Sequence, residues 1–143
     1  MTNSNNLIDS LEVYVLNNPD DVKPHWVSHF IVPTANELLI KIKNKNGNSG
    51  FGLATSYSDI SPIIKPFSNG LQDFIIGQDP FCPEKIYESI SKLTDTRISS
   101  EKGWSKEALI RISAALDIAC WDLMGKSSNI PLYKLFGGYR NKI

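Results

Sequence analysis

Several features that would point directly to a function are scarce in this sequence. Its 143 residues include two cysteines, Cys82 and Cys120, which lie far apart, so neither a disulfide framework nor a cysteine metal site is expected. Fifteen basic and fifteen acidic residues balance and form no block of one sign, which gives no electrostatic basis for binding nucleic acid or a membrane surface. No apolar run approaches membrane-spanning length, and the first residues lack the basic and apolar regions of a signal peptide. We therefore expect a soluble, cytoplasmic protein of one domain.

Three segments in the first half of the chain alternate apolar and polar residues with the period of half-buried strands: residues 7–16, 37–43 and 50–55. Asn46 and Gly47 stand between the second and third segments, and both tolerate the positive φ of a tight hairpin turn. Shorter helical patterns follow at residues 61–68, 71–76 and 83–93. Three antiparallel strands in a meander followed by a helical bundle predict an α+β domain.

The third predicted strand carries two glycines between its large apolar residues. Phe51 and Leu53 are expected on the apolar face of the sheet. Gly50 and Gly52 have no Cβ, so they permit either a bulge or the close approach of another backbone.

The longest helical pattern follows Ser105, which is a suitable N-cap. One apolar stripe recurs at helical spacing: Leu109, Ile112, Leu116, Ala119 and Leu123. A second apolar set lies on other faces: Ile110, Ala114, Ile118 and Trp121. The helix must therefore be covered on more than one side. Gly125 is expected to end it, and Pro131 is expected to begin a short helix that Gly137 and Gly138 stop.

The run SAALDIACWDLMGKSSNIPLYKLFGG, residues 113–138, resembles the segment that closes the N-terminal capping domain of mandelate racemase and muconate lactonizing enzymes, a branch of the enolase superfamily. In this family the matching residues belong to the scaffold, which here implies a structural role for Asp117, Trp121, Asp122, Gly125, Lys126, Pro131, Gly137 and Gly138. One departure is Leu53, which follows Gly50-Phe51-Gly52 where many relatives carry a glutamate.

Asp117 and Asp122 are also residues of the type that acid–base or metal chemistry uses. Residues five apart on a helix point in different directions, so these two carboxylates cannot form a close pair from this helix alone. The simpler interpretation is burial with hydrogen bonds or an ion pair, such as one with Lys126.

Residues 17–36, between the first two predicted strands, are too many for an ordinary connection and too apolar for a solvated linker. In the resembled family the corresponding loop folds over the mouth of a barrel and helps to select the substrate, and the loop after the third strand forms a second part of this lid. The resemblance therefore implies these specificity residues: His25, Trp26, His29 and Phe30 in the first loop, and Thr55, Ser56 and Tyr57 in the second.

Other interpretations of these two loops stay open. The aromatic and aliphatic residues of the first loop could pack on the sheet with both histidines in solvent, and the hydroxyls of the second could serve only turns and helix caps. His25 and His29 also have the spacing of two metal ligands on a helix. However, Pro24 and nearby β-branched residues disfavour a helix, and no third ligand lies close in sequence, so no metal site is expected.

In the resembled family, the two glycines and the basic residues after them, here Arg140 and Lys142, lead into the first strand of a (β/α) barrel. The resemblance implies a capping domain over residues 1–138, with residues 139–143 starting the connection to a barrel that this chain does not include. We expect a fragment or a truncated gene product. The family's bases and metal ligands lie on the barrel, so no catalytic residue and no metal ligand is assigned to this chain.

The resemblance implies that the intact parent is a Mg²⁺-dependent enzyme that abstracts the proton α to a carboxylate, with the metal held by the barrel. A sugar-acid dehydratase is the first expectation and a mandelate racemase-like racemase or epimerase the second, and the fragment alone is expected to be inactive. The expected partners are its own barrel, a small carboxylate substrate such as a sugar acid, and further copies in a homo-oligomer. The alternative is a non-catalytic module that binds another protein through the surface that the barrel would cover, although an uncovered apolar helix face favours truncation.

Overall fold

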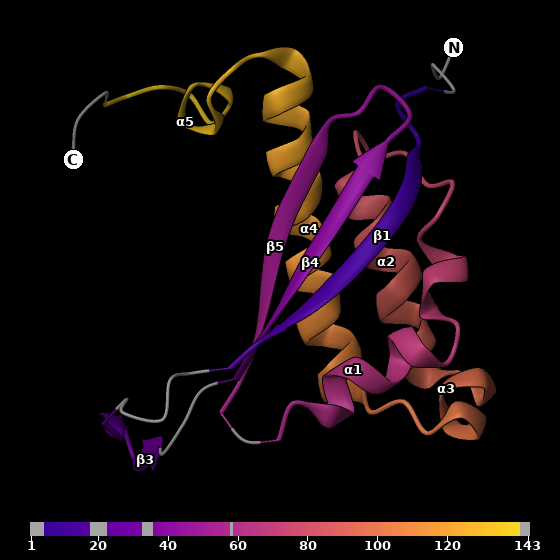
Figure 1. The fold of residues 1–143 in the computed structure, drawn as a ribbon, viewed down its shortest axis with the longest axis vertical. Coiled ribbons are helices and arrows are strands. Elements are labelled where there is room, and N and C mark those ends of the chain that lie inside the picture. The colour runs from indigo at the N-terminus through magenta and orange to yellow at the C-terminus, as the bar shows by residue number, and fades with distance from the viewer. Residues whose placement is uncertain (1–4, 18–22, 33–35, 58, 141–143) are drawn as a thin grey trace.

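The computed structural model describes residues 5–17, 23–32, 36–57 and 59–140 of the chain. The strands are β1 (Ile8–Leu16), β2 (His25–Val27), β3 (Phe30–Val32), β4 (Asn36–Asn44) and β5 (Ser49–Ser56). The α-helices are α1 (Ser61–Ser68), α2 (Pro83–Lys92), α3 (Arg97–Lys102), α4 (Lys106–Ser128) and α5 (Leu132–Leu135), and the 3₁₀ helices are η1 (Leu71–Phe74) and η2 (Leu93–Asp95). Figure 1 shows the long helix α4 behind a sheet of β1, β4 and β5, with β2 and β3 set apart from it.

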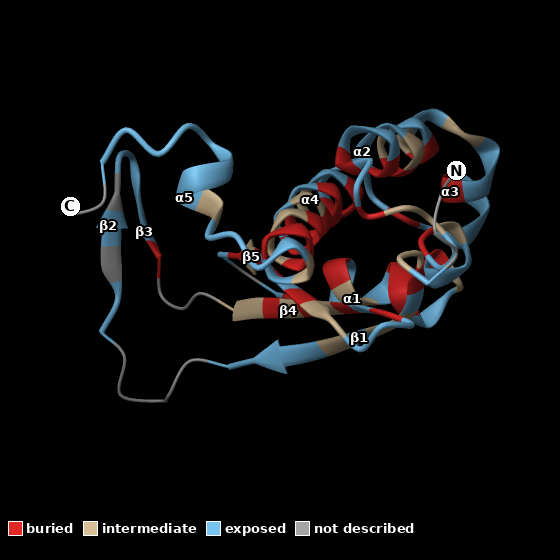
Figure 2. Cartoon of the chain, turned by 90° about the horizontal axis from the view of Figure 1, so that it is seen from above, coloured by how far each residue is buried: buried red, intermediate tan, exposed pale blue. Residues whose placement is uncertain are grey.

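Strands β1, β4 and β5 form one antiparallel sheet in which β4 is central. The register places Ile40 opposite Val13 on β1 and Gly52 on β5, so all three residues belong to the same face of the sheet. This face also presents the fully buried Leu38 and Ile42, and the helices pack against it (Figure 2). The predicted α+β architecture, a three-stranded meander with helices, is therefore confirmed.

Helix α4 packs closely on β5, and the strand faces it with small residues. A Cβ added at Gly50 would stand 1.9 Å from the carbonyl oxygen of Ala119, and Ala54 is buried on the same face. The predicted close approach at the glycines is thus confirmed. The predicted placement of Phe51 and Leu53 on the core-facing side of the sheet is wrong, because the glycines occupy the helix-facing positions and turn both large side chains to the opposite, exposed side.

Helix α4 begins as the sequence predicts but ends later. The Oγ of Ser105 accepts a hydrogen bond from the Ala108 N–H at 3.1 Å, so Ser105 caps the first turn. Gly125 does not end the helix, which continues to Asn129, a residue with the left-handed φ of 53°. The reason is packing: Gly125 is buried, and a Cβ on it would stand 3.1 Å from the carbonyl oxygen of Ile130 in the following turn.

The predicted short helix after Pro131 is present as α5, and two glycines stop it. The N–H of Gly137 donates to the Lys134 carbonyl and the N–H of Gly138 to the Tyr133 carbonyl, at 3.1 and 2.8 Å. Both glycines have positive φ, as this ending requires. Among the described residues, no helix combines the length and the apolar content needed to cross a bilayer.

Candidate functional site

The first predicted lid segment contains a two-stranded hairpin, β2–β3, which extends beyond one end of the main sheet (Figure 1). Trp26 pairs with Ile31 across the hairpin. Trp26 is 74% exposed and Phe30 is 51% exposed, and Ile31 is exposed as well. The alternative that these three side chains pack on the sheet is therefore wrong. The hairpin presents an aromatic surface to its surroundings.

The two histidines of this segment lie on a hairpin, not on a helix. The backbone of His25 belongs to β2, although its side chain is outside the described part, and His29 is exposed in the turn between the strands. A metal site built from a helical His-x-x-x-His pair therefore has no structural basis. In the described ranges, no group of three or more His, Cys, Asp or Glu side chains could hold a metal ion.

The second predicted lid segment meets the first through one pair of rings. Thr55 and Ser56 end β5, and Tyr57 follows them. The ring of Tyr57 packs edge-to-face on that of Phe30, with 6.4 Å between the ring centroids and 68° between the ring planes. Ser56 differs from its neighbours Thr55 and Tyr57 because it is buried, and its hydroxyl donates to the carbonyl of Asp59 at 3.1 Å. The structure thus brings Phe30 and Tyr57 together and uses the Ser56 hydroxyl within the turn.

An apolar surface lies between the hairpin at one end of α4 and α5 at the other. Ile118 on α4 is 53% exposed and lines a shallow hollow of about 240 Å³ with Leu39, Phe51 and Leu53 of the sheet. We call these four residues the exposed apolar patch. Ile118 belongs to the second apolar set of α4, and the other three lie on the side of the sheet that the helices leave open. Figures 1 and 2 both show the hairpin and α5 projecting beyond the same side of the domain. The sheet covers only one side of the helix, as the sequence predicts.

The two aspartates of α4 are used separately and locally. The Oδ2 of Asp122 accepts a hydrogen bond from the N–H of Phe51 at 3.0 Å and forms an ion pair with Lys126. The Nζ of Lys126 also lies 4.7 Å from the centre of the Phe51 ring. Burial, helped by the negative charge of Glu84, raises the pKa of Asp117. These contacts tie α4 to the edge of β5 and supply no paired acid and base.

The two cysteines are free, and they differ in exposure. Cys82 is exposed and Cys120 is fully buried. Burial raises the pKa of the Cys120 thiol to about 12, with smaller contributions from Asp117 and Asp79. Cys120 is therefore protonated at neutral pH and cannot serve as a thiolate nucleophile.

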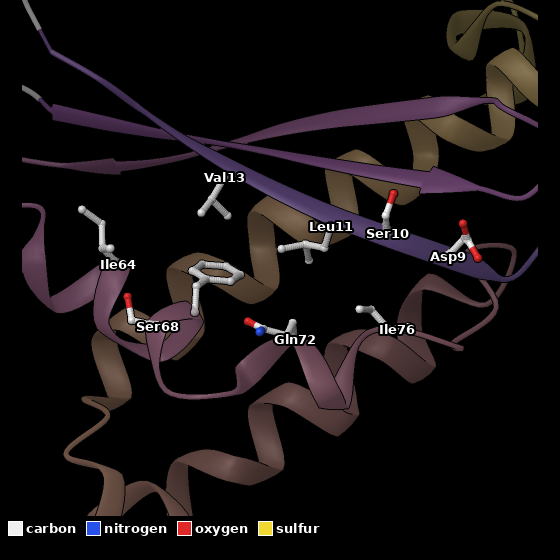
Figure 3. Close-up of a pocket in the computed structure, with 9 residues that line it drawn as sticks. Asp9, Ser10, Leu11, Val13, Ile64, Ser68, Gln72 and Ile76 are labelled. Carbon is white, nitrogen blue, oxygen red and sulfur yellow. The ribbon is translucent and has the colours of Figure 1, made fainter.

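A separate groove lies under β1, away from the predicted lid residues. It has a volume of about 360 Å³ and is lined by Leu11 and Val13 of β1 and by Ile64, Ser68 and Gln72 of the facing helices (Figure 3). Its polar lining includes Asp9 at the start of the strand. The described residues that line the groove form no catalytic grouping. This groove contains none of the residues that the sequence assigns to substrate selection.

Comparison with known proteins decides the family. The model of the mandelate racemase/muconate lactonizing enzyme N-terminal domain matches residues 10–137, nearly the whole chain. The chain belongs to this family. A racemase from Streptomyces coelicolor A3(2), solved with bound magnesium, superposes with a TM-score of 0.74 at 26% identity. The superposition covers 93% of this chain and 36% of the racemase chain.

Named relatives of this mandelate racemase/muconate lactonizing enzyme domain include epimerases and dehydratases. The L-Ala-D/L-Glu epimerase of Clostridium acetobutylicum is 32% identical over 126 residues, which are 85% of this chain and 32% of the relative. The D-gluconate/D-galactonate dehydratase of Picrophilus torridus is 31% identical over 134 residues, 94% of this chain and 31% of the relative. The chain thus spans about a third of the length of these relatives.

Two features of the candidate site in this mandelate racemase/muconate lactonizing enzyme domain were missed from sequence. The first is the Phe30–Tyr57 ring contact, and the second is a hydrogen bond from Arg111 on α4 to the backbone carbonyl of Thr55. Both join residues that are far apart in the chain, and no periodic pattern marks either pair. A basic residue one turn after Glu107 was the only available signal, and that spacing is common on helix surfaces.

Proposed function

We propose that residues 1–138 form the capping and substrate-specificity domain of a Mg²⁺-dependent enzyme that abstracts the proton α to a carboxylate, and that residues 139–143 begin the connection to a barrel domain. We propose that the enzyme is a sugar-acid dehydratase or a racemase or epimerase, because the chain's relatives include a named dehydratase and a named epimerase. The substrate would be a small carboxylate, such as a sugar acid or a dipeptide. The expected cytoplasmic location stays a prediction.

The observation that carries this proposal is the exposed apolar patch between the β2–β3 hairpin and α5. Ile118 and Leu53 are large apolar residues that are exposed next to one another, and contiguous exposed apolar patches mark interaction sites. Trp121 and Phe136, whose ring centroids lie 4.8 Å apart, continue the apolar surface toward the end of the described chain. A barrel that follows α5 would cover this surface and would come within reach of the hairpin.

The lid residues suit the recognition of a small polar acid. His25 and His29 carry ring N–H donors that can bind a carboxylate or hydroxyl group. Trp26, Phe30 and Tyr57 supply flat apolar surfaces, and the tyrosine adds one hydroxyl group. Such side chains would close over the barrel mouth, exclude water and favour substrates whose length and polarity match. They would select the substrate without taking part in proton transfer.

The metal would be held outside the described part of this chain, since its residues form no group of three or more potential ligands. When bound at the barrel, Mg²⁺ supplies positive charge next to the substrate carboxylate. The capping domain would contribute closure and selectivity. We therefore propose that this chain alone is inactive and that the intact enzyme assembles as a homo-oligomer.

Binding between separately produced cap and barrel tests the proposal. We expect the isolated chain to bind the barrel domain of the complete protein, and Ile118→Glu to weaken that binding about tenfold or more, because it buries an unpaired charge. Tyr87→Glu is the control, since Tyr87 is similarly exposed but lies on α2. Equal binding of the two variants, or no complex with the barrel, would refute the docking role. Tight binding to an unrelated protein through Ile118 would instead support the non-catalytic module.

A further inference from the structure

The two lid segments have one described ring contact, and this contact cannot position them unaided. Phe30 and Tyr57 are both about half exposed. A single edge-to-face pair between two exposed rings is a weak contact, so it can hold the hairpin only against a Tyr57 that is itself fixed. One of the two segments must therefore be fixed to the body of the domain if their relative position is to be defined.

Arg111 provides such an attachment for residues 55–57. One terminal nitrogen of its guanidinium donates to the backbone carbonyl of Thr55. Its Nε and its other terminal nitrogen donate to one carboxylate oxygen of Glu107, at 3.0 and 2.8 Å. Glu107 lies one turn earlier on α4. Because the guanidinium is planar, the two bonds to Glu107 fix the direction of the third donor, which faces Thr55.

The other side of the same segment is tied to the start of α1. The hydroxyl of Ser56 donates to the Asp59 carbonyl. The Asp59 carboxylate in turn accepts from the N–H and the hydroxyl of Ser61, at 3.0 and 2.8 Å. Ser56, Asp59, Glu107 and Arg111 surround a small hollow of about 60 Å³, so the two attachments are parts of one cluster. The cluster links the rigid core helix to the base of the lid.

We propose that Arg111 is a positioning residue for substrate selection: it holds the carbonyl of Thr55, which sets the place of Tyr57 and, through the ring contact, of Phe30 on the hairpin. Arg111 does not touch the substrate in this account. The inference rests on the proposed function, in that residues 25–32 and 55–57 form the lid. The competing account is that Arg111 is an ordinary surface partner of Glu107 that stabilises α4 alone.

The first experiment measures the lid geometry in the 143-residue chain by NMR, through the nuclear Overhauser effect between the rings of Phe30 and Tyr57. We expect Arg111→Ala to abolish this effect and to speed amide exchange at residues 55–57 about tenfold, with no such change at amides of α2. Arg111→Lys keeps the charge but cannot reach Glu107 and Thr55 with a fixed fork, so it should restore the ring contact only in part.

The control variant is Arg97→Ala. Arg97 pairs with Glu101 at the same helical spacing, through an Nε–Oε1 distance of 2.6 Å, but it lies on α3 and is highly exposed. It should leave the ring contact intact. If Arg111→Ala also leaves the ring contact intact, or if it speeds exchange equally throughout the chain, Arg111 has only a structural role and the inference is overturned.

The second experiment uses the complete enzyme and compares kcat/KM for a compact and a bulky carboxylate. We expect Arg111→Ala to change the ratio about fivefold or more, mainly through KM, with proton abstraction retained. If the ring contact is lost in the chain but the substrate ratio is unchanged, residues 25–32 and 55–57 do not select the substrate, and the proposed lid function fails. An unchanged ring contact would instead refute the role of Arg111 and leave the lid function in place.

Discussion

Gly52 of β5 and Ala115 of α4 lie at one of the two points where the helix approaches the strand too closely for a Cβ. A Cβ on Gly52 would stand 1.9 Å from the carbonyl oxygen of Ala115, a distance that no relaxed structure allows. Gly52→Ala therefore has to push α4 away from β5 or distort the strand. We expect it to lower the free energy of unfolding by about 3 kcal/mol, at the upper end of overpacking costs. Urea denaturation followed by circular dichroism measures this loss.

A matched substitution in the same strand controls for the change in β-propensity. Ser49 is partly exposed and precedes the close contacts, so Ser49→Ala should change stability by less than about 0.5 kcal/mol. If Gly52→Ala is as stable as the unmodified chain, the described packing of α4 on β5 is incorrect.

Asp122 should matter for stability through its oxygen atoms more than through its charge. Asp122→Ala leaves the Phe51 N–H without its acceptor and should cost about 1–2 kcal/mol. Asp122→Asn keeps an acceptor oxygen and loses mainly the ion pair with Lys126, which is partly exposed, so it should cost under about 1 kcal/mol. Chemical denaturation of both variants gives the order. The reverse order would show that the ion pair dominates.

The two thiols should react at very different rates. Cys82 is exposed, whereas burial keeps Cys120 protonated and out of reach of reagents. We expect a disulfide reagent that reports thiolate release to detect one equivalent in the native chain at pH 8 and two in denaturant. Cys82→Ser should remove the fast equivalent. Rapid modification of the native Cys82→Ser variant would contradict the burial of Cys120.

Asp117 should make stability depend on acidity in the direction opposite to that of an ordinary ion-paired carboxylate. Burial and Glu84 raise its pKa, so the folded state holds this proton more tightly than the unfolded state. This contribution is present below the ordinary pKa of 3.8 and is lost as the pH rises through the raised value. Asp117→Asn removes the effect. Its stability relative to the unmodified chain should be greater at pH 7 than at pH 3, and denaturant midpoints at both pH values measure the difference. An equal difference at the two pH values would refute the shift.

The architecture was predictable because periodicity and burial agree over most of the chain. On β4, the alternation that places Leu38, Ile40 and Ile42 together in the sequence is the alternation of buried side chains in the structure. The faces of β5 were not predictable in the same way. Large apolar residues normally face the core, but here α4 approaches so closely that Gly50 and Gly52 must occupy the inner positions.

The candidate site was predictable only as far as the resemblance extends. Trp26 and Phe30 lie exposed on a projecting hairpin, and their role as lid residues stays a prediction. The register that pairs Trp26 with Ile31 has no signal of its own in the sequence. The contact between Phe30 and Tyr57 depends on the relative placement of two separate loops. Likewise, a glycine such as Gly125 is typical of a helix end. Here it lies inside α4, because the carbonyl of Ile130 comes too close to leave comfortable room for a Cβ.

Solvent exchange of the substrate's α-proton tests the central claim most directly. The complete protein is incubated in deuterium oxide with sugar acids and dipeptides, with and without Mg²⁺, and the α-proton signal is followed by NMR. The account predicts metal-dependent loss of this signal for at least one small carboxylate with the complete protein, and no loss with the 143-residue chain alone. Exchange by the isolated chain, or none by the complete protein with any of these acids, would contradict a capping domain of a proton-abstracting enzyme.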